Sequence, residues 1–354
     1  MSSQKRLLEL SMMNVLFCIL VILIHVSSEP VSVLSKDSAA YIAVMAPQRL
    51  SSFVVQGFIF LSGLKLFLHP EREFDFIAFL IKRIKLIIAP YLLWVLLYYC
   101  YFVSIGYFPF RFGDLLRYIL VGDLVAHFYF VIIIVQFFLL VPLFRVFVKK
   151  APAAVLLLTA LLITLVCSRY LPAILELVGV QNFAYNDRVF TSYLIYWTLG
   201  CLVGRHYQAF KAKVYRYRYA VTIAFVLTAA IDLVLYDLSM RRLFRFAFLD
   251  EFHILYCIAA IFFVFLITDK LTKHVGKRGV SVLGTIDRST YHIYLCHCLF
   301  IFWLNNKMTE LGLVSIGQRF FVRFVFVYIL SFLMCAGWQL CKSAADRRLS
   351  RGIS

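Results

Sequence analysis

The sequence predicts an all-α, polytopic membrane bundle of about ten transmembrane helices with both termini in the cytoplasm. Three observations predict it: the composition, the spacing of the apolar runs and the distribution of basic residues. Of the 354 residues, 63% are hydrophobic and 15% are charged, and the mean hydropathy is +0.89. A soluble domain is about 45–50% apolar and about 25% charged. We therefore do not expect a soluble enzyme, and the aromatic and aliphatic content excludes disorder.

The apolar runs account for the helices one by one. A spanning helix needs about 20 apolar residues, and ten runs approach that length. They lie near residues 10–28, 53–68, 87–103, 128–147, 153–170, 191–207, 219–238, 252–267, 291–305 and 320–340. The longest connections, 29–48, 104–126 and 176–191, are too short for a separate catalytic domain. Residues 1–354 are therefore interpreted as one integral-membrane domain.

The basic residues indicate an orientation. The chain has 36 Lys and Arg against 18 Asp and Glu, a net charge of +18. Such a charge suits nucleic acid or an anionic surface, but no folded basic module accompanies it, so a nucleic-acid partner is not expected. With the N-terminus inside, 22 basic residues fall in cytoplasmic segments, 11 in outer segments and three at span ends. Basic residues favour the cytoplasmic side, so we expect a multi-pass protein of a cell membrane, the bacterial plasma membrane, in contact with its lipids.

His25 is the first polar candidate, because an ionisable group inside a span is costly and therefore a functional candidate. It follows Leu10 by 15 residues, which is about 22 Å along a helix and places it in the outer third of the first span. Asn14 precedes it by 11 residues, or three turns, on nearly the same face. Glu29 follows it by four and could orient the imidazole. A reactive His and one that only bonds a neighbouring helix both fit.

Lys82, Arg83 and Lys85 form a basic cluster before Pro90, at the cytoplasmic start of the third expected span. It is either an anchor of the positive-inside kind or an anion site for a phosphate-bearing substrate, since the Arg fork matches phosphate oxygens. The small residues of GFIFLSG at 57–63, with Ser62 before the last Gly, are typical of close helix packing.

Further polar groups lie in or beside the spans. His127 and Tyr129 belong to an aromatic stretch that suits the membrane interface, and His127 could face the same cavity as His25. His297 could join a polar interior, although core packing is the better explanation of it. Asp232 lies inside the seventh expected span, must face protein or water, and could relay protons in a transporter.

The remaining signals are negative. The nine cysteines have no CxxC spacing and most lie in apolar runs, which is typical of core cysteines. No metal site is expected. The sequence contains no Walker A loop, no GxGxxG after a strand and no HExxH, and no GxSxG nucleophile elbow.

Six segments, taken in order, resemble the integral-membrane acyltransferase 3 family. The resemblance runs from the first span to the last, and its order makes it more specific than any one segment. The segments are a His near the outer end of the first span, GFIFLSG at 57–63, KRIKLIIAPYLLW at 82–94, HFYFVIIIVQFFLLVPLF at 127–144, YWTLGCLVG at 196–204 and STYHIYLCH at 289–297.

The resemblance implies O-acyl transfer. The donor would be cytoplasmic acyl-CoA, most often acetyl-CoA, and the acyl group acetyl or succinyl. The acceptor would be a hydroxyl of a cell-surface glycan or lipid-linked sugar, as in the subgroup that modifies polysaccharides. The family has an Arg 11 positions before the His, where this sequence has Asn14. Arg83 matches the first of a paired-Arg pattern, Leu86 stands where the second often stands, and Lys85 is a partial substitute.

The resemblance also distributes roles. His25 would be the general base or the acyl carrier, with Asn14 as a hydrogen-bond donor and Glu29 beside it. The donor phosphates would engage Arg83, Lys85 and Lys82. The candidates for acceptor binding are Ser62, His127, Tyr129 and His297.

Other classes of protein remain open. A transporter or flippase for the same surface polymer fits ten spans and Asp232, although no internal repeat or broken pair of spans supports it. A membrane protein without catalysis is the third possibility. The sequence leaves the acyl group, the acceptor and the oligomeric state open.

Overall fold

A computed structural model describes residues 7–69 and 73–351, with side chains described up to residue 342. Every regular element in these residues is helical, so the expected all-α class is confirmed. Lys5, Arg6 and Arg72, which entered the charge distribution, lie outside the described residues. The orientation of the termini stays a prediction from that distribution.

The chain forms two compact units. The first comprises Met1–Val54 and Val214–Ser354, and the second comprises Val55–Lys213.

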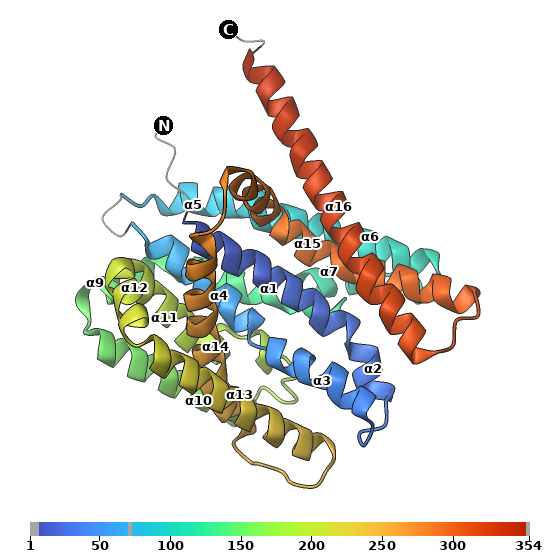
Figure 1. The fold of residues 1–354 in the computed structure, drawn as a ribbon, viewed down its shortest axis with the longest axis horizontal. Coiled ribbons are helices and arrows are strands. Elements are labelled where there is room, and N and C mark those ends of the chain that lie inside the picture. The colour runs from blue at the N-terminus through green and yellow to red at the C-terminus, as the bar shows by residue number, and fades with distance from the viewer. Residues whose placement is uncertain (1–6, 70–72, 352–354) are drawn as a thin grey trace. The chain divides into compact units, whose positions relative to one another are not determined.

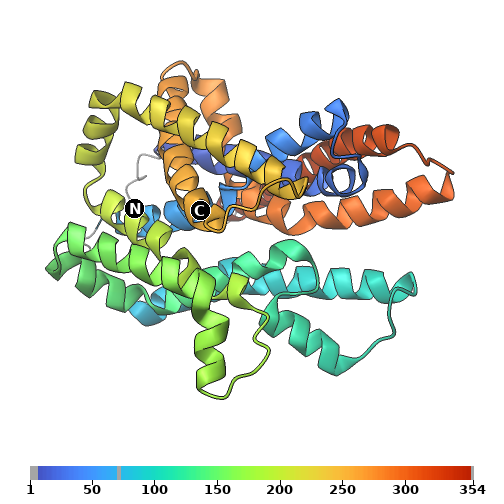
Figure 2. The same ribbon diagram turned by 90° about the horizontal axis from the view of Figure 1, so that it is seen from below.

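The first unit is built around α1 (Leu8–Val26). This helix packs against α3 (Ala39–Ser51), α14 (Leu249–Thr272), α15 (Lys277–Glu310) and α16 (Ile316–Arg351) (Figure 1). A short helix, α2 (Ser28–Val33), joins α1 to α3, and α13 (Arg218–Met240) lies along α14. The α15–α16 hairpin runs from orange to red in Figure 2.

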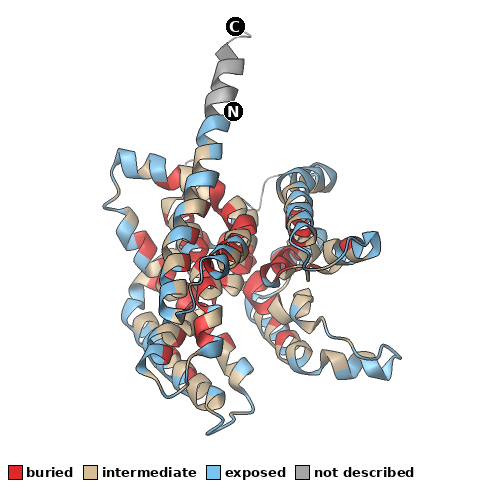
Figure 3. Ribbon diagram, turned by 90° about the vertical axis from the view of Figure 1, so that its right-hand side faces the viewer, coloured by how far each residue is buried: buried red, intermediate tan, exposed pale blue. Residues whose placement is uncertain are grey.

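Spacing of apolar side chains explains why α1 occupies the centre of this unit. Its buried residues include Met13, Phe17, Cys18, Val21 and Ile22. Each of these residues lies three or four positions from another, which keeps the side chains on one stripe of the helix, facing the neighbouring helices. Figure 3 shows the same segregation elsewhere, with buried residues in red on inward faces and exposed residues in pale blue on outward faces.

The second unit runs from α4 to α12. Its first part is α4 (Val54–Phe67), α5 (Phe76–Arg83), a π-helical turn (Ile84–Ile88), α6 (Ala89–Ser104) and α7 (Phe112–Val121). Its second part is α8 (Tyr129–Leu139), α9 (Val141–Lys150), α10 (Ala153–Leu177), α11 (Leu194–Arg205) and α12 (Tyr207–Arg216). The long helix α10 packs along α11 and α9.

Glycines bring α4 and α11 into backbone contact. A Cβ on Gly63 would come within 2.8 Å of the Trp197 carbonyl oxygen, and a Cβ on Gly200 or Gly204 would overlap the carbonyls of Phe60 or Leu64. Close packing, expected for GFIFLSG, is therefore confirmed, and the LGCLVG segment is its partner. Glycine is needed here because any side chain would hold the two backbones apart.

Seven of the described helices or helix pairs are long and apolar enough to span a membrane, and the bent pair Phe112–Val121 and Ala126–Leu139 could make an eighth. The sequence predicted about ten spanning helices. The three expected spans that are not among these seven are 128–147, 191–207 and 291–305. Helix α8 has 11 residues and ends at Leu139, α11 has 12 residues, and 291–305 is part of α15, whose other residues include many polar side chains.

The expected outer loop at 29–48 is mostly helical. Helices α2 and α3 occupy this segment, and α3 continues almost directly into α4 to form the candidate span Ala39–Phe67. Arg49, which we expected to lie outside the membrane, is therefore inside a candidate span. The sequence pattern obscured this because Lys36 and Asp37 lie just before the span and Arg49 interrupts its apolar run.

We predict that Gly200→Ala destabilises the protein by about 2 kcal/mol or more, because the added methyl group must separate α4 from α11. The measurement is thermal unfolding of the detergent-solubilised protein.

The matched control is Gly113→Ala on α7 of the same unit, where a Cβ meets nothing within 4 Å. This change should be neutral or stabilising, since Ala favours helix by about 1 kcal/mol over Gly. Equal unfolding temperatures for the two variants would contradict the assigned contact.

Candidate active site

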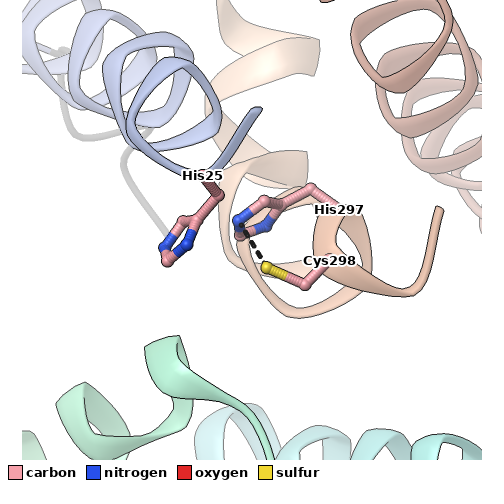
Figure 4. Close-up of side chains that lie close together, drawn as sticks. All are labelled: His25, His297 and Cys298. Carbon is pink, nitrogen blue, oxygen red and sulfur yellow. Dashed lines mark hydrogen bonds between the residues drawn. The ribbon is translucent and has the colours of Figure 1, made fainter. Parts of the chain in front are cut away.

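The candidate active site lies in the first unit, where the last turn of α1 meets the middle of α15. His25 of α1 faces His297 of α15, with the ring centroids 5.1 Å apart (Figure 4). His297 is fully buried, whereas His25 is half-buried. The sequence had singled out both residues, and the structure brings them together.

Cys298 completes this cluster. Its Sγ lies 3.3 Å from Nε2 of His297, and one ligand-type atom from each of His25, His297 and Cys298 lies within 4.8 Å of the other two. Sequence reasoning missed Cys298 because a cysteine in an apolar run is normally a core residue. The available signal was its position next to His297.

The protonation of His297 follows from its surroundings. Its Nδ1 lies 2.7 Å from the carbonyl oxygen of Tyr294 and 3.2 Å from that of Ile293. A carbonyl oxygen only accepts, so Nδ1 carries the hydrogen in the neutral ring and Nε2 holds a lone pair. That lone pair faces the Cys298 thiol and can accept its proton.

Two imidazoles and a thiol are also ligands that Zn²⁺ uses in proteins. Within the described residues, this trio is the group of three that could hold a metal ion. The expectation that the protein uses no metal stays a prediction.

A polar bracket sets the alignment of α1 with α15. The side-chain amide of Asn14 donates to Oδ1 of Asp287 at 2.7 Å and to Oγ1 of Thr290 at 2.8 Å, and Ser11 donates to Oδ2 of Asp287 at 2.8 Å. Residues further along α1 meet residues further along α15, so the two helices run in the same direction. Along both helices, these contacts come before the pair of His25 and His297.

Asp287 is the residue in the bracket that sequence reasoning missed. It lies outside the expected span 291–305, so it was not counted as a costly intramembrane charge. Both N–H groups of the Asn14 amide have partners on α15. The predicted role of Asn14 toward the acyl group stays a prediction.

Glu29 is paired with α16. Its carboxylate lies 3.5 Å from Nε of Arg319 and forms a close ion pair with Arg323, which is only 1% exposed. Arg323 also donates to Oδ1 of Asn305 at 3.0 Å. These contacts hold the short helix after His25 against α16, and Arg323 links α16 to α15. The predicted orienting role of Glu29 toward His25 stays a prediction.

A second buried polar network surrounds Asp232, as its place in an apolar run required. Arg49 forms two hydrogen bonds of 2.8 Å with the carboxylate, and Nδ1 of His253 lies 2.9 Å from it. The other ring nitrogen of His253 lies 3.1 Å from Oγ of Ser52. The network joins α3, α13 and α14, and the charge of Asp232 is balanced inside the protein.

The predicted donor residues lie in the second unit and differ in environment. The guanidinium of Arg83 is held over the rings of Phe79 and Phe138, 4.8 and 4.9 Å from their centroids. Lys82 and Lys85 are exposed. Lys85 belongs to the π-helical turn Ile84–Ile88, a local irregularity that is frequent at functional sites.

The other predicted site residues of this unit have distinct surroundings. His127 is buried against Phe128 and Tyr98, with ring centroids 4.6 and 6.2 Å away. Tyr129 begins α8 and is half-buried. Ser62 precedes Gly63 at the contact of α4 with α11. These residues and His25 belong to different units.

The second unit also contains a basic cavity of about 330 Å³. Phe67 and Val148 are among its apolar lining. Its cationic lining residues are Arg145, Lys149, Lys150 and Arg205. We had interpreted all four as evidence about orientation, so sequence reasoning did not anticipate that they share a cavity.

Comparison with known proteins assigns the chain. The profile of the acyltransferase domain family, acyltransferase 3, matches residues 8–337. The chain belongs to the acyltransferase 3 family. The match spans both units. Together with the seven candidate spans, it identifies a multi-pass membrane acyltransferase.

A relative gives the same assignment to the acyltransferase family. YfiQ of Bacillus subtilis (strain 168), which carries the name of a membrane-bound acyltransferase, is 26% identical over 301 residues, or 83% of this chain and 80% of YfiQ. No solved structure matches the chain.

We predict that Asp232→Asn destabilises this acyltransferase by about 3–5 kcal/mol, because Arg49 is left with an unbalanced charge in the interior. Thermal unfolding in detergent measures the change.

Asp237→Asn is the matched control on the same helix. Asp237 pairs with Arg241 at the end of α13, where both side chains are partly exposed, so its loss should cost about 0–1 kcal/mol. If the two variants unfold alike, Asp232 does not hold the unit together.

Proposed function

We propose that this acyltransferase moves an acyl group from acyl-CoA to a hydroxyl of a cell-surface glycan or lipid-linked sugar. Acetyl is the first choice for the acyl group, and succinyl is the alternative. The membrane is the bacterial plasma membrane. The observation that carries the proposal is the meeting of His25 with His297 in a chain of this family. The product is an O-acyl ester, and CoA leaves as the free thiol.

His25 is the base in this mechanism. Imidazole exchanges protons near neutral pH, and a positioned general base typically contributes about 10²–10⁴-fold to a rate. Because His25 is half-buried, a hydroxyl can approach it while the bundle excludes most water. His297, on the facing helix, contacts the same space and is a candidate for acceptor binding.

Arg83 is the central donor residue. The rings of Phe79 and Phe138, which pack edge to face against each other, hold its guanidinium in place, and its Nε lacks a hydrogen-bond partner among the described residues. A pre-organised fork of this kind suits a phosphate. Lys85 and Lys82, exposed nearby in the chain, supply further positive charge for the pyrophosphate and 3′-phosphate of CoA.

The remaining candidates complete the acceptor and support roles. Ser62, His127 and Tyr129 are proposed as acceptor ligands. Asn14 and Glu29 support the site through α15 and α16, by the contacts described above.

Transport of the same polymer is the weaker proposal. It needed Asp232 as a proton-relay carboxylate, and the fork of Arg49 holds that carboxylate in a bidentate ion pair. Arg49 and His253 together contact both oxygens of that carboxylate, so the network around Asp232 favours a structural role.

The decisive prediction concerns His25. In a strain that lacks the gene, glycan mass analysis should show the loss of a fixed acyl mass. Wild type should restore it, and His25→Ala should leave about 1% or less, since the base contributes about 10²–10⁴-fold.

His274→Ala, a change at an exposed histidine of the same unit, should restore acylation fully. Equal membrane levels and size-exclusion profiles show that the variants fold. Full acylation with His25→Ala would remove His25 from the mechanism, and an unchanged glycan in the deletion strain would exclude this acyltransferase function.

The donor residue has its own test. Arg83→Ala should weaken binding of acetyl-CoA to the solubilised protein about tenfold or more, because about 1.4 kcal/mol corresponds to a factor of ten and a charge-assisted hydrogen bond is of this order. Titration calorimetry measures the affinity.

Lys213→Ala, at an exposed basic position of the same unit, is the control and should bind like wild type. If Lys149→Ala weakens binding and Arg83→Ala does not, the phosphates bind in the basic cavity and Arg83 is excluded as their ligand.

A further inference from the structure

We propose that Cys298 carries the acyl group as a thioester between donor and acceptor, with His297 as the base that activates it. His25 then acts in the second half of the reaction. This proposal rests on the proposed acyl transfer and adds a covalent intermediate to it. The observation that carries it is the 3.3 Å contact between Cys298 Sγ and His297 Nε2.

The three groups around this contact have the order of an activated nucleophile. Such a site needs a nucleophile within reach of a base, and a third group that orients the base. The carbonyl oxygen of Tyr294 is the third group, 2.7 Å from Nδ1 of His297. It holds the hydrogen on Nδ1 and leaves Nε2 to accept the thiol proton.

The contact is not a default of helix geometry. Residues adjacent in a helix point about 100° apart and do not normally face each other. The side chains of His297 and Cys298 nevertheless turn to one point, on the side where His25 of α1 lies (Figure 4). Their convergence with a residue from a different helix indicates a site built in three dimensions.

Three other buried cysteines of the same unit, Cys18, Cys296 and Cys335, provide a comparison. Cys18 Sγ lies 3.6 Å from the carbonyl oxygen of Thr290, and Cys296 Sγ lies 3.5 Å from that of Ile293 and 3.7 Å from Cys335 Sγ. Backbone carbonyls accept a thiol hydrogen bond but remove no proton. The contact of Cys298 is with an imidazole, which can remove one.

Burial favours the intermediate. Cys298 is 6% exposed, and an active site that excludes water protects a reactive intermediate from hydrolysis. A thioester formed there is therefore available to the acceptor hydroxyl. The half-buried ring of His25, on the facing helix, leaves the acceptor a route to the same place.

In the first step, Cys298 Sγ attacks the carbonyl carbon of acyl-CoA while its proton moves to Nε2 of His297. The new C–S bond forms, the C–S bond to CoA breaks, and the CoA sulfur takes the proton from His297 and leaves as a thiol. A thioester replaces a thioester, so no oxidant, reductant or further reactant is needed.

In the second step, His25 removes the proton of the acceptor hydroxyl, whose oxygen attacks the Cys298 thioester. The C–O bond forms, the bond to Sγ breaks, and Sγ takes the proton from His25. The sum is acyl-CoA plus alcohol giving ester plus CoA. Donor and acceptor react in separate steps, which is the ping-pong pattern of covalent catalysis.

The test uses the full-length protein in nanodiscs with radiolabelled acetyl-CoA and no acceptor. Wild type should gain one acetyl group per chain, released by neutral hydroxylamine and located on Cys298 by peptide mass spectrometry. Cys298→Ala and Cys298→Ser should lose this hydroxylamine-labile label. His297→Gln should form it at least tenfold more slowly.

Two further variants make the assignment specific. His25→Ala should be labelled like wild type and retain the label, because only the second step needs His25. Cys296→Ala, a change two positions away on the same helix, should behave as wild type. Size-exclusion profiles and unfolding temperatures separate lost chemistry from lost folding, and the Ser variant keeps the size and the hydrogen-bonding group of Cys298.

Several results would overturn the proposal. One is full acyl transfer by Cys298→Ser with no acetyl group found on the wild-type thiol, which means direct transfer and leaves the proposed function intact. Another is acetyl found on His25. A third is one zinc ion per wild-type chain that is lost in Cys298→Ala, which makes the thiol a metal ligand. A wild-type gene that changes no glycan acylation would instead contradict the proposed function itself.

Discussion

The alignment of α1 with α15 decides where the reactive groups of the first unit meet. Asn14, Asp287 and Thr290 hold the two helices in one register by short hydrogen bonds. About three turns further along, the same register places His25 opposite His297. A slip of one residue would rotate each side chain by about 100° and separate the pair, so these hydrogen bonds set the positions of His25 and His297 relative to each other.

The apolar surroundings explain why so many polar groups occur in pairs. A charge or amide without a partner is costly inside a membrane bundle. In the described residues, several of these groups are paired with a group on another helix. Arg49 and His253 satisfy Asp232, and Arg323 satisfies Glu29. These pairs join helices that apolar contacts alone would allow to slide past one another. They therefore fix the positions of the helices as well as balancing the buried charges.

Residue patterns predicted the class of fold and part of the site. Long apolar runs have one favourable outcome in a membrane, which is helix, and an ionisable group within such a run is conspicuous, so His25 and Asp232 were visible. Asp287 and Cys298 were not. The first lies outside the expected span, and the second has the composition of a core residue until its contact with His297 is known. The number of spans was also uncertain, because polar residues interrupt the apolar run before α4 and a short buried helix such as α11 has the same apolar pattern as a spanning one.

The sequence by itself determined that the protein is helical, apolar and basic, because hydropathy and charge are properties of the residues. It also placed an ionisable residue, His25, within the first apolar run. Only the tertiary structure decided which groups share a site. Partners such as His25 and His297 are far apart in the chain, and their meeting depends on the register of two helices, which no local pattern encodes. Arg49 is a second example. It was expected in a loop, and only the packing of α3 against α13 places it beside Asp232.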